Sequence, residues 1–165
     1  MRSVTRQRKI PEAIRSHSGM VSPDYVDLFS VTTDETTRAS PERWSRTTIE
    51  DAAGTGGQFI WRGVLGLRLN SRPAGVGGWR IAGRGDDWIR LEASSWFLTA
   101  HLVIHLDGKH LSVGTFIRYD HPIATLVWTP ASTVHRQLMP DLLRKTMRLQ
   151  RRMDRDAAPS PQTGH

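Results

Sequence analysis

The chain has 165 residues, of which 38% are hydrophobic and none is cysteine, and it carries a formal net charge of +7. This length is typical of one globular domain, and the lack of cysteine excludes a disulfide scaffold, a cysteine-ligated metal site and a thiol nucleophile. The sequence has no apolar run of about eighteen residues and no secretory signal, so we expect no membrane span and a cytoplasmic protein.

The two ends of the chain are predicted to lie outside the folded domain. Residues 1–22 are interpreted as a flexible basic leader and residues 154–165 as a disordered tail, which leaves a domain at 23–153. The positive charge is concentrated in residues 1–15 (+4) and 141–156 (+3), and the segment between them is neutral. Because this distribution differs from a basic stripe across a folded surface, nucleic acid is not predicted as a partner.

A strand followed by two short helices is predicted next. Residues 24–31 alternate polar and apolar side chains, as a strand does. Ser40 is a good helix cap and Pro41 suits the first helical position, so a helix is expected from there. After the glycines at 54–57, the apolar residues between Phe59 and Leu67 recur at helical spacing and indicate a second helix.

From Gly78 onward, the pattern has the period of two that is typical of antiparallel strands. Strands are predicted at 79–81, at 88–91 and at 123–128. Between them, Asp107-Gly108 is a strong hairpin signal, and a turn at these two residues would place Ile104 opposite Leu111 and Leu102 opposite Val113. This register puts the large apolar residues on one covered face and leaves the other face open.

The last predicted element is a long amphipathic helix from Ala131 to Met153. Its expected buried stripe includes Val134, Leu138 and Leu142. Pro140 lies inside this segment and is expected to kink the helix, because proline removes one hydrogen bond and clashes with the preceding turn.

These elements predict an α+β fold of the helix-grip kind, a curved antiparallel sheet wrapped around a long C-terminal helix, with two short helices after the first strand. The segments at 23–29, 85–93 and 115–119, together with His135-Arg136 and Pro140, resemble the SRPBCC or START-like superfamily and, within it, the actinobacterial DUF2867-type proteins of unknown function. The resemblance spans about residues 23–152 and implies a cavity between sheet and helix for an apolar or amphipathic ligand. It implies no chemistry by itself, because one fold supports many functions.

Most of the candidate ligand-binding residues lie on the expected covered face of the sheet; Trp61 and Trp96 are expected as walls of the cavity, and His135 is expected at its mouth. Their side chains are apolar, aromatic or able to form hydrogen bonds in a cavity. They are Trp61, Trp96, Leu98, Leu102, Thr115, Ile117, Tyr119 and His135. His135 is the best candidate for a catalytic group, but a surface histidine on the flank of the helix is the alternative. No metal site and no cofactor is predicted: His101 and His105 would lie far apart along one strand, and His105 and His110 are interpreted as solvated side chains.

Two functions remain open at this point. The leading hypothesis is a non-catalytic protein that binds a small apolar or amphipathic molecule, because the covered face carries no evident acid–base pair. The alternative is an enzyme of the polyketide cyclase or dehydratase type that uses the same cavity, with His135 as its acid or base. Neither hypothesis predicts the oligomeric state.

Overall fold

A computed structural model describes residues 3–33, 39–70 and 74–159 of the chain, and it has the predicted α+β architecture. Its centre is a curved, six-stranded antiparallel sheet in the order β1-β2-β6-β5-β4-β3. The strands are β1 (Val4–Arg6), β2 (Tyr25–Thr32), β3 (Arg80–Arg84), β4 (Trp88–Ser94), β5 (Leu98–Leu106) and β6 (His110–Tyr119).

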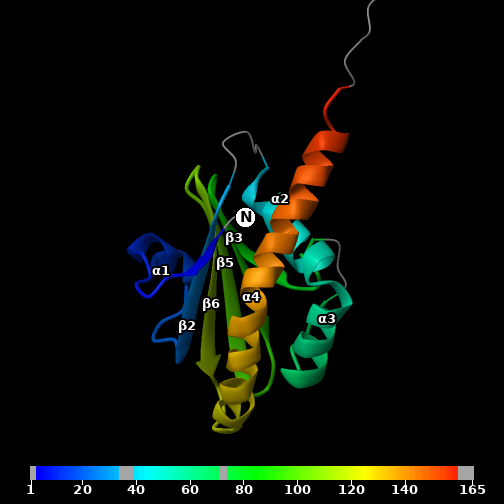
Figure 1. Cartoon of the computed structure of the whole chain (residues 1–165). Helices are drawn as coiled ribbons and strands as arrows, with labels where there is room; N and C mark the ends of the chain where they lie inside the picture. The colour runs from blue at the N-terminus through cyan, green and yellow to red at the C-terminus, as the bar shows by residue number, and fades with distance from the viewer. Residues whose placement is uncertain (1–2, 34–38, 71–73, 160–165) are drawn as a thin grey trace, which may run out of the picture.

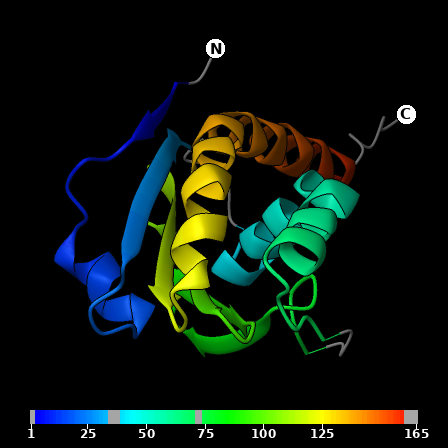
Figure 2. The same ribbon diagram turned by 90° about the horizontal axis from the view of Figure 1, so that it is seen from below.

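Helices cover both faces of this sheet. The helical elements are α1 (Glu12–Ser18), α2 (Pro41–Arg46), the π-helical η1 (Thr47–Ala52), α3 (Gly54–Gln58), the π-helical η2 (Phe59–Val64) and α4 (Ile123–Asp156). Figure 2 shows α1 on one side of the sheet, and α4 with the helices that follow β2 on the other. Among the described residues, no helix combines the length and apolarity needed to cross a membrane.

The predicted helix start at Ser40 is confirmed. The Ser40 hydroxyl accepts a hydrogen bond from the Arg43 backbone N–H at 3.2 Å, and Pro41 occupies the first turn. The helical stretch from Pro41 to Val64 is divided at Gly54, whose φ of +52° breaks the helix. Phe59 and Val64, two of the apolar residues whose spacing indicated the second helix, are exposed.

The β5–β6 hairpin exists, but its predicted register is wrong by two residues. Ile104 lies opposite Val113 and Leu102 opposite Thr115. The turn residues are Gly108 and Lys109, because the Asp107 carboxylate accepts hydrogen bonds from the backbone N–H groups of Lys109 and His110 at 2.9 and 2.7 Å. Since side chains alternate with a period of two, this shift leaves the side chains of β5 and β6 on their predicted faces, whereas Trp96 lies outside β5.

The segment predicted as a strand at 123–128 is wrong, because it forms the first turns of α4. The chain enters this helix after Pro122, and both Pro130 and Pro140 lie within it. The direction of the α4 ribbon changes along its length (Figure 1), and proline inside a helix removes a backbone hydrogen bond. Its buried side is also rotated from the prediction: Trp128, Met139 and Leu143 are buried, whereas Val134 and Leu138 are about half exposed.

The N-terminal segment is folded, in contrast to the prediction of a flexible leader. Strand β1 pairs with β2, and α1 packs on the face of the sheet that was expected to be open. The physical reason is a second hydrophobic cluster, in which apolar residues of the N-terminal segment meet apolar residues of β2, β5 and β6. Its buried members are Ile10, Ile14, Met20, Leu28, Val103 and Phe116. At the other end, α4 continues to Asp156, and residues 160–165 of the predicted tail lie outside the described residues.

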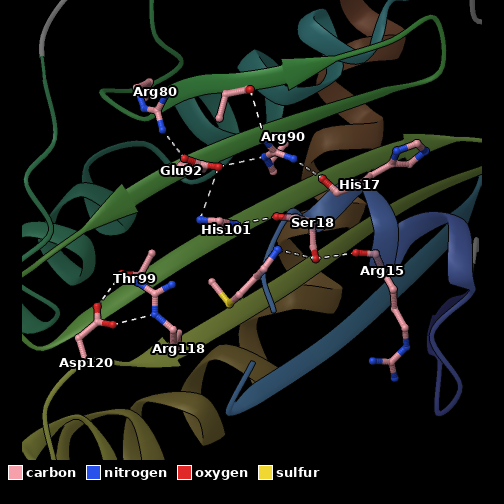
Figure 3. Close-up of polar contacts among 12 residues, drawn as sticks. Arg15, His17, Ser18, Arg80, Arg90, Glu92, Thr99, His101, Arg118 and Asp120 are labelled. Carbon is pink, nitrogen blue, oxygen red and sulfur yellow. Dashed lines mark hydrogen bonds and ion pairs between the residues drawn. The ribbon is translucent and has the colours of Figure 1, made fainter. Parts of the chain in front are cut away.

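Polar side chains of the sheet also hold α1 in place (Figure 3). Arg90 donates a hydrogen bond to the His17 carbonyl at 2.9 Å, and His101 Nδ1 lies 2.6 Å from the Ser18 carbonyl oxygen. Donors of this kind satisfy the last carbonyl groups of a helix, which have no partner within it. His101 is therefore a buried structural residue, although the face of the sheet that carries it was expected to be open.

Candidate functional site

A cluster of polar side chains lies beneath α4, near the centre of the sheet. Tyr25, Asp27 and Phe29 alternate along β2 and face α4. Asp27 lies directly opposite Thr115 of β6, and His135 approaches both residues from α4. Two residues predicted from the sequence, Thr115 and His135, therefore come together with two that were not.

The polar atoms of this cluster converge on one carboxylate oxygen. The Nε2 atom of His135 lies 3.0 Å from Asp27 Oδ2 and 3.3 Å from Thr115 Oγ1. The Tyr25 hydroxyl donates to the same Asp27 oxygen at 2.5 Å. The Asp27 side chain is 0% exposed and that of His135 is 22% exposed, so the pair is closed toward the sheet and partly open at α4.

Burial determines the electrostatics of the cluster. A buried carboxylate is costly unless hydrogen bonds or opposite charge compensate for the lost water. Burial, and then the neighbouring Asp27 carboxylate, raise the pKa of Tyr25 above its ordinary value, while Arg136 partly opposes this shift. The Tyr25 hydroxyl therefore stays protonated at neutral pH and serves as a donor to Asp27.

Two buried atoms in this region have no hydrogen-bond partner among the described residues. They are Asp27 Oδ1, an acceptor, and Trp128 Nε1, a donor. The Trp128 ring lies 5.2 Å from the Tyr25 ring and 5.7 Å from the His135 ring, so both atoms belong to one cluster. Buried polar groups are nearly always satisfied by protein, water or ligand, and each exception calls for an explanation.

The other candidate residues of the covered face are mostly packed in the core. Leu98 and Ile117 are almost fully buried, Leu102 is 8% exposed, and Tyr119 is half-buried. Leu102 of β5 lies opposite Thr115 of β6, and Ile117 of β6 lies opposite Tyr25 of β2, so Leu102 and Ile117 flank the polar cluster.

The two predicted tryptophan walls do not join this cluster. Trp61 packs edge-on against Trp79, with 5.5 Å between ring centroids. Trp96 precedes β5, is 60% exposed, and contacts Phe97 and His121. A pocket of about 430 Å³ lies elsewhere, at the β3–β4 edge of the sheet, and none of the eight predicted ligand-binding residues lines it.

Asp27, Tyr25 and Trp128 were missed by the sequence interpretation. The available signal was the acidic residue at a position of β2 that alternates with Phe29 and Val31, which are buried against α4. An acidic side chain in the buried row of a strand needs a partner, and only the folded chain identifies it as His135.

Comparisons with known proteins identify no relative of this chain. No protein-family model matches it, and no curated protein and no solved structure is significantly similar. The resemblance to the START-like superfamily therefore stays a prediction. Within the described residues, no group of three or more His, Asp or Glu side chains is placed to hold a metal ion.

Proposed function

We propose that this protein binds a small apolar or amphipathic molecule between the sheet and α4, and that the Asp27–His135 pair recognises a polar group of that molecule. One observation carries the proposal: Asp27 Oδ1 and Trp128 Nε1 are a buried acceptor and a buried donor that lack partners within the described residues. A hydroxyl or amide group of a ligand supplies the matching donor and acceptor. The protein acts in the cytoplasm in this proposal.

The surroundings suit a ligand that is largely apolar. The rings of Tyr25, Phe29 and Trp128 lie around His135, and Leu102 and Ile117 flank the cluster. Ligand sites are typically apolar with a few well-placed polar groups. Because both unpaired atoms are closed to solvent, the ligand enters by displacing side chains that pack over them.

The test is native mass spectrometry of the wild-type protein after gentle purification from its own host. We expect a bound small molecule that is retained by the wild type and lost by Asp27→Asn, which keeps the shape of the side chain but changes its charge and one acceptor. His135→Gln is the second variant, and both are compared by circular dichroism to verify folding. The proposal would be contradicted if the purified wild-type protein has only the mass of its chain and if adding candidate lipids leaves its native mass spectrum unchanged.

A second function is favoured by the Asp27–His135 contact itself. A carboxylate that holds one ring nitrogen of a histidine orients the ring and leaves the other nitrogen to exchange a proton with a substrate. This arrangement supports the alternative of an acid–base enzyme of the cyclase or dehydratase type. If the retained molecule is converted by the protein, His135→Gln should lower turnover by roughly 10²- to 10⁴-fold while affinity changes little.

A further inference from the structure

The pocket at the β3–β4 edge of the sheet, called the recess from here on, is separate from the Asp27–His135 cluster. The strand order places β2 and β6 at one part of the sheet and β3 and β4 at the other end. The recess has a volume of about 430 Å³ and is lined by residues that include Arg68, Asn70, Trp79, Arg80, Ile81 and Glu92. This volume lies within the usual range of small-molecule sites, about 300 to 1,000 Å³.

The backbone that carries Arg68 is held against the sheet. The Arg68 N–H donates to the Ser94 carbonyl at 2.9 Å, and the Asn70 N–H donates to the Gly78 carbonyl at 2.9 Å. These bonds connect the segment after η2 to the end of β4 and to the residues before β3. The recess is therefore built on hydrogen-bonded backbone, which limits the entropy lost when a ligand binds.

The charge of the recess is positive. Glu92 is the acidic residue among those that line it, and its carboxylate is already paired with Arg80 and, at 3.0 Å, with the Nε atom of Arg90 (Figure 3). His101 Nε2 lies 3.5 Å from the same carboxylate. Within the described residues, the Arg68 side chain has no hydrogen bond or ion pair. Its guanidinium group is thus available to an anion, because Glu92 is committed to other bases.

One side of the recess is apolar. Ile81 and Ala93 line the recess and are half-buried, so they offer apolar surface to it, and the almost fully buried Trp79 is also among the lining residues. A guanidinium group binds carboxylate or phosphate through paired N–H donors, and an apolar wall favours a hydrocarbon chain or ring. We infer that this recess is a second binding site, and that it takes a small amphipathic anion with its headgroup on Arg68 and its apolar part along Ile81 and Ala93.

The site is tested by NMR titration of the ¹⁵N-labelled full chain with three probes of equal chain length: sodium hexanoate, hexyl phosphate and 1-hexanol. We expect both anions to shift the amide signals around Arg68 and Glu92, and 1-hexanol to bind at least about tenfold more weakly, as expected when a charged hydrogen bond is lost. Tighter binding of hexyl phosphate assigns a phosphate headgroup, and tighter binding of hexanoate assigns a carboxylate.

The variants Arg68→Gln and Arg148→Gln separate the site from general charge attraction. Both positions are exposed and both changes remove one positive charge, but Arg148 lies on α4 and does not line the recess. Arg68→Gln should weaken hexanoate binding by at least about tenfold, and Arg148→Gln should leave it unchanged. Equal binding of 1-hexanol and hexanoate, equal loss in the two variants, or no binding of either anion would overturn the inference.

This experiment is independent of the proposed function at Asp27 and His135. Those two residues do not line the recess, so Arg68→Gln should not change the mass retained by the site beneath α4. Conversely, Asp27→Asn should leave the hexanoate titration unchanged.

Discussion

The contact between Asp27 and His135 should be energetically coupled, and a double-mutant cycle measures that coupling. The two changes are Asp27→Asn and His135→Gln, each of which keeps a polar side chain of similar size. The Nε2–Oδ2 distance is 3.0 Å, and the side chains are 0% and 22% exposed. Each single variant removes the contact. The coupling energy is the difference between the loss of unfolding free energy in the double variant and the sum of the losses in the two single variants.

The expected magnitude follows from the burial of the pair. Hydrogen bonds to charged groups contribute about 1.5 to 3 kcal/mol net, and we expect a coupling energy in this range. His135→Gln alone should cost about 3 kcal/mol, the lower end for breaking a buried pair, because His135 is partly exposed and Tyr25 still donates to the carboxylate.

Urea unfolding followed by tryptophan fluorescence at one fixed pH provides the free energies. The control is the same cycle with Asp141→Asn and Arg144→Gln, an ion pair of 2.8 Å on the surface of α4 whose aspartate is 80% exposed. Such exposed pairs contribute about 0.2 to 1 kcal/mol. A coupling below about 0.5 kcal/mol for Asp27–His135 would refute the reasoning, because it would match an exposed pair instead of a buried one.

Three further predictions concern α1 and the face that it covers. Ile14→Ala should lower the free energy of urea unfolding by about 2 to 5 kcal/mol, since Ile14 is 3% exposed. A loss below about 0.5 kcal/mol would instead support the prediction that the N-terminal segment is flexible. Gly19→Ala should lower the melting temperature more than Gly108→Ala does. Both glycines have a positive φ, but only at Gly19 would an added Cβ lie near the Arg90 side chain, at 2.6 Å. Equal decreases would show that the Arg90 side chain moves aside at little cost. Burial lowers the pKa of His101 below 6.5, so the unfolded chain binds the proton more readily, and the free energy of unfolding should fall as the pH drops below about 6.5. His101→Gln should make the free energy of urea unfolding depend less on pH. An unchanged pH dependence would contradict the buried, structural role of His101.

Local patterns in the sequence were sufficient for most of the architecture. The alternation of side chains in β5 and β6 determined which residues face α4, and the Ser40-Pro41 pair located the start of α2. These features depend on neighbours in the chain, namely on the period of a strand and on the hydrogen bonds of a helix cap, so they can be derived without knowing the fold.

Other features depended on side-chain hydrogen bonds within a turn or on contacts between distant segments, and the alternation of apolar residues shows neither of these. The hairpin turn moved by one position because the Asp107 side chain accepts hydrogen bonds from the turn, and the segment at 123–128 became helical although its apolar residues also suit a strand. The N-terminal helix packs on the sheet because Val103 and Phe116 provide an apolar surface for Ile14, and because Arg90 and His101 contact its last carbonyl groups. The pairing of Asp27 with His135 likewise requires α4 to lie across β2, and a buried carboxylate finds its partner only when tertiary packing excludes water from both.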